Sequence, residues 1–172
     1  MQKHALFIVA LENFRDEEFF VPQKILAEAG IETTVASQKA GKCVGKLGGS
    51  VEAVIGLNQI NVEDFDAVIF VGGSGSQIFN QNIAAHLIAR KAAENNKVLA
   101  AICAAPTILA KAGVLDGKQA AVFPDPHYQT ILADGGATLT CLGVETDGNI
   151  ITANGPAVAE EFGKKIVAAI EA

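Results

Sequence analysis

The sequence contains no tryptophan, one tyrosine and one methionine, and aromatic residues make up only 6% of its 172 residues. Half of the chain is nevertheless hydrophobic, and Ala, Val, Ile and Leu carry most of that content. Small and branched apolar residues suit strands that helices bury on both faces. A chain of this length favours one sizeable core, so we expect a single domain over residues 1–172.

Long apolar runs and clusters of positive charge are also missing. No apolar stretch is long enough to span a bilayer. The apolar run at residues 5–11 is short and lacks a small-residue cleavage site, so it predicts a first strand and not a secretion signal. The net charge is -6, and the sequence contains no run of Lys and Arg that would form a basic patch. We therefore expect neither nucleic acid nor a membrane as a partner.

Cysteine is scarce: the chain has three, Cys43, Cys103 and Cys141. None lies in a C-x-x-C pair, which argues against a zinc site or a thioredoxin-like site. An odd count without a signal peptide is typical of a reducing compartment. The sequence thus predicts a cytoplasmic protein with no metal site.

Apolar strand patterns alternate with helical patterns along most of the chain, which predicts an α/β fold with a mostly parallel sheet and helices on both faces. Two glycine-containing turns, at 48–49 and 147–148, predict hairpins. The expected strands are residues 5–11, 31–37, 65–71, 97–103 and 119–123, and the expected helices are residues 16–30, 83–96, 105–113 and 155–172.

Reactive groups are expected where the parallel strands end, because those ends share one edge of the sheet. Cys103 directly follows a buried strand and precedes a helix that is expected to begin near Ala104. A helix N-terminus stabilises a thiolate, so we expect Cys103 to have the lowest pKa of the three thiols. The backbone N–H groups of Gly73 and Ala104 could bind an oxyanion. Glu18 is the expected carrier of protons.

Each of these residues also has an ordinary structural explanation. A lone cysteine in an apolar strand is commonly a core residue. An acidic helix start such as the one that contains Glu18 is usually a solvated face. The pair Gly72 and Gly73 could be a plain strand-to-helix turn, since the P-loop lysine is absent. His127 is the one histidine that follows a strand at this edge, and a loop role is more common for such a residue.

The segments "AAICAAPTILAKAGVLDGK", "EEFFVPQKILAEAGIETTVAS" and "DFDAVIFVGGSGS" resemble the ThiJ/PfpI superfamily, which is class I glutamine amidotransferase-like and includes the parkinsonism-associated protein deglycase. The resemblance runs from about Ala5 to Ile170. It implies a flavodoxin-like three-layer sandwich with a small β-hairpin and a homodimer or larger assembly. It also implies that Cys103 is the reactive cysteine, that Glu18 contacts it, and that the amides of Gly73 and Ala104 bind the oxyanion.

The sequence departs from the superfamily at two positions. The peptidase branch has histidine directly after the cysteine, where this chain has Ala104, and the deglycase branch has histidine where this chain has Phe123. His127 could replace the missing imidazole, but it does not align with either of these positions. We therefore expect Glu18 to transfer protons without a histidine. The first hypothesis is a weak glyoxalase or deglycase that acts on dicarbonyls such as methylglyoxal and needs no metal and no organic cofactor. The second is an oxidative-stress sensor whose Cys103 becomes a sulfinic acid without turnover. A cysteine peptidase or a covalent hydratase ranks lower.

Overall fold

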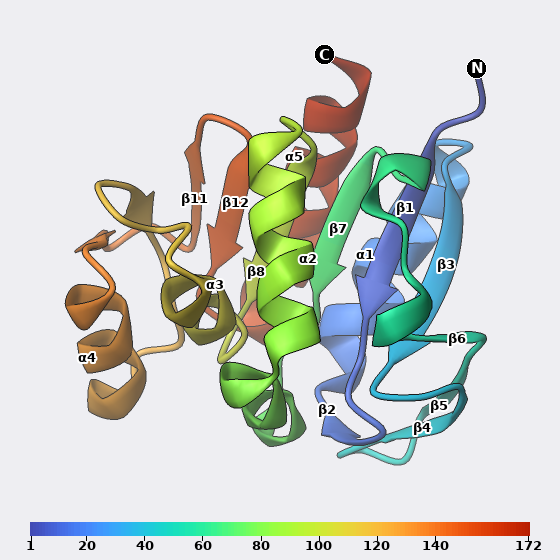
Figure 1. Cartoon of the computed structure of the whole chain (residues 1–172), viewed down its shortest axis with the longest axis horizontal. Helices are drawn as coiled ribbons and strands as arrows, with labels where there is room; N and C mark the ends of the chain where they lie inside the picture. Colours follow the sequence, from blue (N-terminus) through green and yellow to red (C-terminus); the bar gives the residue numbers. More distant parts are fainter.

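The computed structural model describes the whole chain, residues 1–172, and its centre is a seven-stranded sheet between two layers of helices (Figure 1). Only β11 runs antiparallel to its neighbour, and every other pair in the sheet is parallel. This confirms the expected flavodoxin-like fold. In spatial order the strands are β11 (Val144–Asp147), β12 (Ile150–Ala153), β8 (Val98–Ile102), β7 (Ala67–Phe70), β1 (His4–Ile8), β3 (Glu32–Ser37) and β6 (Ile55–Gly56).

The helices bury both faces of the sheet, and the alternation of side chains along each strand supplies both cores. In β1, Leu6 and Ile8 join the apolar cluster under α2 and α3, whereas Ala5 and Phe7 join the cluster under α1 and α5. None of the helices combines the length and apolar character needed to span a membrane. The α-helices are α1 (Asp16–Glu28), α2 (Ile83–Glu94), α3 (Pro106–Ala112), α4 (Pro126–Asp134) and α5 (Ala159–Glu171), and the 3₁₀ helices are η1 (Leu57–Gln59), η2 (Val62–Asp64), η3 (Ser74–Gln81) and η4 (Pro156–Val158).

A small sheet lies beyond the carboxyl ends of the central strands (Figure 1). It consists of β2 (Glu12–Phe14), β4 (Gly41–Gly45) and β5 (Ser50–Ala53), and β4 and β5 pair antiparallel. The predicted hairpin around Gly48 is therefore confirmed. The hairpin predicted around Gly148 is also confirmed, since β11 and β12 pair antiparallel.

The strand predicted at residues 119–123 is wrong in length and in place. Only β9 (Gln119–Ala120) is extended, and it pairs with β10 (Thr138–Leu139) outside the central sheet. The amide N–H of Ala121 donates to the hydroxyl oxygen of Thr152 at 2.9 Å and so leaves the strand ladder. An apolar pattern cannot reveal this side-chain acceptor, which lies far away in the sequence.

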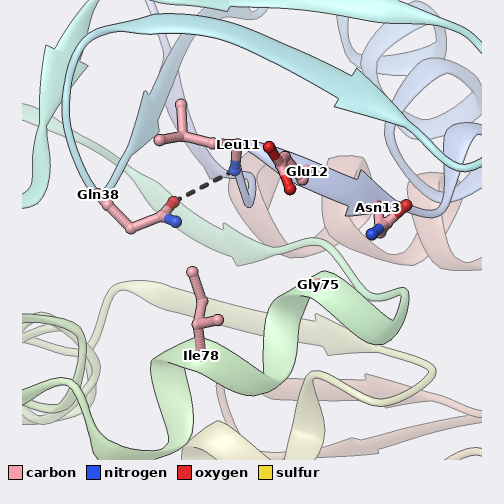
Figure 2. A pocket seen from close by; sticks show the side chains of 6 residues that line it. All are labelled: Leu11, Glu12, Asn13, Gln38, Gly75 and Ile78. Carbon is pink, nitrogen blue, oxygen red and sulfur yellow. Dashed lines mark hydrogen bonds between the residues drawn. The ribbon is translucent and has the colours of Figure 1, made fainter.

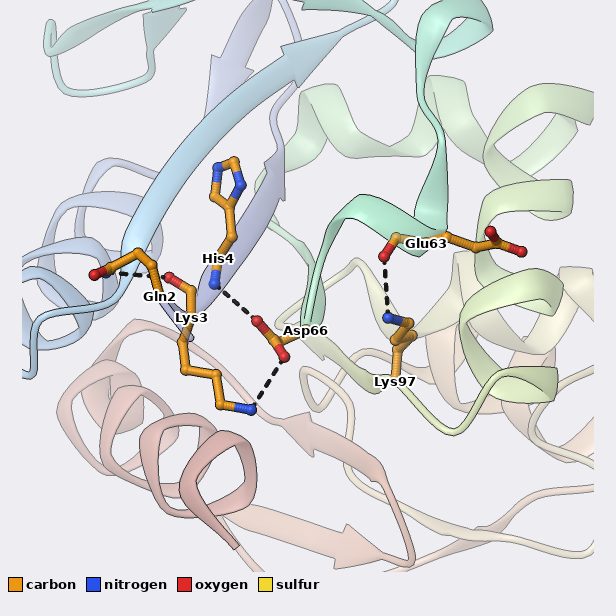
Figure 3. A network of polar contacts seen from close by, with 6 residues as sticks. All are labelled: Gln2, Lys3, His4, Glu63, Asp66 and Lys97. Atoms are coloured by element: carbon orange, nitrogen blue, oxygen red, sulfur yellow. Dashed lines mark hydrogen bonds and ion pairs between the residues drawn. The ribbon is translucent and has the colours of Figure 1, made fainter.

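Polar contacts connect the segments at the opposite end of the sheet, where β1, β7 and β8 begin (Figure 3). Asp66 accepts a hydrogen bond from the His4 amide at 2.9 Å and pairs with the Lys3 ammonium at 3.2 Å. The Lys97 ammonium donates to the Glu63 carbonyl at 3.3 Å. Both chain ends lie on this side of the molecule (Figure 1), which leaves the carboxyl ends of the strands as the edge available for a site.

Candidate active site

Cys103 lies on a strained turn at the end of β8. Its φ is +65°, in the left-handed region that residues other than glycine seldom adopt. The Cys103 amide donates to the Ala153 carbonyl at 2.8 Å, and the Cys103 carbonyl accepts from the Phe123 amide at 2.9 Å. These bonds hold a conformation that costs about 1–2 kcal/mol, as expected where a strand turns sharply to present a nucleophile.

The helix that follows starts later than the sequence predicts. α3 begins at Pro106 and not near Ala104, because a proline with no N–H and a fixed φ suits the first helical position. The Ala105 amide closes a turn onto the Ile102 carbonyl at 3.0 Å. The Ala104 amide therefore stays outside the helix and lies close enough to the Cys103 sulfur to favour its thiolate, as does the Gly73 amide.

Glu18 lies in the first turn of α1 and is fully buried. Neither of its carboxyl oxygens makes a hydrogen bond of good geometry, although the Cys103 thiol and the Gly72 amide are close enough to favour the ionised form. Burial outweighs them and raises the pKa of Glu18 to about 7. The ordinary alternative, a solvated acidic face, is thus wrong for Glu18.

Glycine at position 72 lets Glu18 and Cys103 approach each other. A Cβ atom added to Gly72 would overlap Glu18 Oε2 and the Ile102 carbonyl and would lie 2.8 Å from Cys103 Cβ. Gly73 has φ of +99°, and a Cβ there would lie 2.6 Å from the Asn13 carbonyl. Gly72 therefore brings the end of β7 against both reactive side chains, and Gly73 packs against the backbone that precedes α1, which a plain turn would not require.

The acidity predicted for Cys103 is contradicted. Burial raises the pKa of its thiol to about 12, with the charge of Glu18 and a hydrogen bond to Glu18 as further causes. The N–H groups of Gly73 and Ala104 oppose this rise but do not reverse it. The sequence indicated both the helix N-terminus and a core position, and burial has the larger effect on the pKa of this thiol. Because the two groups contact each other, they share their protons, and the Glu18 carboxyl ionises at lower pH than the Cys103 thiol.

A cavity of about 220 Å³, which we call the Cys103 cavity, leads from solvent to the thiol. No local sequence pattern marks Arg15, Lys46, Asp125 or Tyr128, because only the folded chain brings these residues together. The lining residues are Arg15, Lys46, Gly73, Ser74, Cys103, Ala104, Phe123, Asp125, Tyr128 and Pro156.

His127 does not line the Cys103 cavity. Its side chain is exposed, and its amide donates to Asp125 Oδ1 at 2.8 Å at the start of α4. The next residue, Tyr128, lines the cavity instead. Burial raises the pKa of Tyr128, with the charges of Asp125 and Cys103 adding to the effect. The phenol is therefore a protonated hydrogen-bond donor at neutral pH, while Phe123 supplies only an apolar wall.

A second cavity, of about 370 Å³, lies beside Gly75 and Ile78 of η3 (Figure 2). Gln38 Oε1 crosses it to accept from the Leu11 amide at 3.2 Å, and Glu12 and Ile78 lie along its walls. It contains no thiol, and its one carboxylate is that of Glu12. No group of three His, Cys, Asp or Glu side chains in the chain is arranged to hold a metal ion.

Known proteins match the chain along nearly its whole length. The sequence model described as the DJ-1/PfpI family matches residues 3–169. Protein dj-1beta of Drosophila melanogaster is 36% identical over 169 residues, which cover 96% of this chain and 88% of that protein. A deglycase of Pyrococcus horikoshii is 36% identical over 152 residues, which cover 88% and 90%. The crystal structure of a ThiJ/PfpI domain protein of Brachyspira murdochii superposes with a TM-score of 0.95 at 30% identity, covering 99% of this chain and 98% of that one.

Proposed function

The chain belongs to the DJ-1/PfpI family, and on that premise we propose that it is a cysteine-dependent enzyme of the glyoxalase or deglycase type. Its substrates in this proposal are small α-oxoaldehydes such as methylglyoxal. The observation that carries the proposal is the contact of a buried carboxyl, Glu18, with a strained thiol, Cys103, at the base of an open cavity. The similarity to the Pyrococcus horikoshii deglycase supports it.

The first step is the addition of the thiol to the aldehyde carbon. The ionised Glu18 takes the thiol proton, and the sulfur forms a bond to the aldehyde carbon while the carbonyl electron pair moves to its oxygen. The amides of Gly73 and Ala104 stabilise the negative oxygen. That oxygen then takes the proton back from Glu18, which gives a neutral hemithioacetal and restores the carboxylate.

The second step moves one proton between adjacent carbons. Glu18 removes the proton from the carbon bonded to sulfur, and the electrons form an enediolate. The hydroxyl proton on that carbon moves to the oxygen of the neighbouring carbon, and Glu18 returns its own proton to the neighbouring carbon, which leaves a carbonyl on the carbon bonded to sulfur. The product is a thioester, which water cleaves to a 2-hydroxy acid and the free thiol of Cys103. The first carbon is oxidised and the second is reduced, so methylglyoxal plus water gives lactic acid without an external oxidant or cofactor.

Lactate formation from methylglyoxal tests this proposal. We expect Cys103→Ser to abolish lactate formation and Glu18→Gln to lower it by a factor of about a hundred or more. Cys141→Ser is the control, since Cys141 is exposed and lies outside the Cys103 cavity. Lactate formation that survives in Cys103→Ser would remove the thiol from the mechanism.

The second candidate is a redox sensor without turnover. The protonated form of Glu18 can donate a hydrogen bond to an oxidised sulfur, and the raised pKa of Glu18 keeps that form populated below about pH 7. Stoichiometric adducts on Cys103 without lactate would favour it. A peptidase and a covalent hydratase rank lower, because Ala104 provides no base beside the thiol. The proposal includes a cytoplasmic homodimer, which sedimentation and fractionation test.

A further inference from the structure

Two cationic side chains, Arg15 and Lys46, line the Cys103 cavity. We infer that this cavity selects α-oxoaldehydes whose tail carries an anion, a carboxylate or a phosphate, and that Arg15 and Lys46 bind that anion. The inference rests on the proposed function, because it names the substrate class for the same thiol. A neutral substrate such as methylglyoxal needs neither cation.

Lys46 is held at the cavity by a turn that is built around a buried carboxylate. Asp16 accepts hydrogen bonds from the Leu47 and Gly49 amides, each at 2.8 Å, and only 8% of Asp16 is exposed. A Cβ atom on Gly45 or Gly49 would overlap that carboxylate. Lys46 therefore projects from a fixed backbone, and its ammonium makes no ion pair with any side chain of the protein.

Arg15 is only partly neutralised by its neighbour. Its Nε contacts Glu17 Oε2 at 2.8 Å and its Nη2 contacts Glu17 Oε1 at 3.1 Å, which leaves Nη1 without a partner. The Glu17 hydrogen bond is the main reason why the pKa of Arg15 is raised, and the charges of Glu18 and Cys103 add to it. The guanidinium is thus near the reacting groups and retains a free donor for a planar anion.

The cavity wall is richer in positive charge than the whole protein. The chain carries -6, whereas the charged side chains that line the cavity are two cations and one carboxylate, that of Asp125; the Glu17 carboxylate pairs with Arg15, and Glu18 lies buried beside the thiol. Asp125 Oδ1 already accepts a hydrogen bond from the His127 amide at the start of α4. Phe123 and Pro156 supply apolar contact for the carbon chain of a substrate. A local positive region of this kind attracts an anion that the rest of the surface repels.

Alkylation with a charged and a neutral reagent of nearly equal size tests the inference without any turnover. Iodoacetate carries a carboxylate, iodoacetamide does not, and mass spectrometry gives the rate constant for each at Cys103. The exposed Cys141 in the same molecule is the internal reference. We expect the iodoacetate-to-iodoacetamide ratio at Cys103 to exceed that at Cys141 by a factor of about five or more. An equal or lower ratio at Cys103 overturns the inference.

Variants that remove a cation and a variant that removes an anion should change the iodoacetate-to-iodoacetamide rate ratio at Cys103 in opposite directions. Lys46→Gln and Arg15→Gln should each lower the ratio at Cys103 by about fivefold, because each removes one nearby cation. Glu17→Gln should raise the ratio, because it releases Arg15 from its partner. Lys42→Gln, an exposed lysine on β4 of the same hairpin, should leave the ratio unchanged. Equal effects of Lys46→Gln and Lys42→Gln would show that only the overall charge matters, which overturns the inference.

Substrates separate the two possible anions. We expect γ,δ-dioxovalerate, which ends in a carboxylate, or hydroxypyruvaldehyde phosphate to be consumed with a kcat/KM at least about fivefold above that of methylglyoxal, and Lys46→Gln to remove this advantage. The better of the two identifies the carboxylate or the phosphate. No turnover of any substrate with the alkylation preference intact refutes the proposed function alone. Turnover of methylglyoxal with no preference for the anions refutes this inference alone.

Discussion

Replacing Glu18 by glutamine should stabilise the fold at neutral and alkaline pH. The Glu18 carboxyl is fully buried, its oxygens make no hydrogen bond of good geometry, and its pKa rises from 4.5 to about 7. A shift of one pKa unit corresponds to about 1.4 kcal/mol, so this shift corresponds to about 3.4 kcal/mol of folding free energy. Glutamine has nearly the same shape and cannot ionise, so it avoids that cost.

The sign of the effect follows from proton binding in the two states. Between about pH 4.5 and 7 the folded chain keeps the Glu18 proton that the unfolded chain has lost. The free energy of unfolding of the wild type therefore falls as the pH rises through this range, and the full penalty is present above about pH 7. The contribution of Glu18→Gln stays constant, so the stability difference between variant and wild type should grow by about 2.5 kcal/mol from pH 5 to pH 8.

Urea unfolding followed by circular dichroism at several pH values measures this difference. Glu17→Gln is the matched control on the same helix turn. The hydrogen bond from Arg15 lowers the pKa of Glu17, so its carboxylate stabilises the fold above its unfolded pKa and loses that effect as the pH falls. Glu17→Gln should therefore be slightly destabilising at neutral pH. A Glu18→Gln protein that is less stable than the wild type near pH 8, or a difference independent of pH, would refute the reasoning.

Three further predictions concern reactivity at the thiol. The rate of alkylation of Cys103 by iodoacetamide should rise with pH, with a midpoint near pH 7, because Glu18 ionises there and can take the thiol proton. In Glu18→Gln this midpoint should move up by more than about one pH unit. An unchanged midpoint would contradict a proton shared between Glu18 and Cys103. Tyr128→Phe should slow methylglyoxal consumption by about tenfold or more, because it removes a hydrogen-bond donor from the cavity wall. His127→Ala should change the rate by less than about tenfold. A larger effect at His127, with the circular dichroism spectrum intact, would mean that its imidazole takes part in the proton transfer. Mild peroxide should stop Cys103 at the sulfinic acid, and Glu18→Leu should shift the products toward sulfonic acid or slow the oxidation, so identical products by mass spectrometry would separate Glu18 from the sulfur.

Much of the fold and the central pair of the site could be predicted from the sequence. Runs such as residues 5–10 and 98–103 are buried on both sides, and their continuous apolar pattern identifies them as central strands. Once the sheet is parallel, its topology brings Glu18, Gly73 and Cys103 to one edge, although they are far apart in the chain. The roles of these residues remain predictions, and the structure supports them by placing the residues in contact.

The rest depends on long-range contacts that no local pattern encodes. The acidity of Cys103 was predicted with the wrong sign because the N–H groups that follow the strand do not outweigh the burial that the apolar run also indicates. Lys46 reaches the cavity only because Asp16 holds its turn from a different element. Tyr128 was missed and His127 was considered, although the two are adjacent, because only the direction of α4 decides which side chain lines the cavity.

The reacting residues and the cation Lys46 belong to different parts of the fold, so the substrate range of the protein can change independently of its chemistry. Cys103 and Glu18 are fixed by the central sheet and α1, so alterations around them disturb the whole core. Lys46 belongs to the turn between β4 and β5, which lies beyond that sheet and is attached to it through Asp16 (Figure 1). Substitution at Lys46, or exchange of the residues between the two strands, can alter which molecules enter while the reacting groups stay in place. A collection of chains that differ only in this turn would share one chemistry and divide a range of substrates among them, provided that Asp16 and its glycine partners are kept.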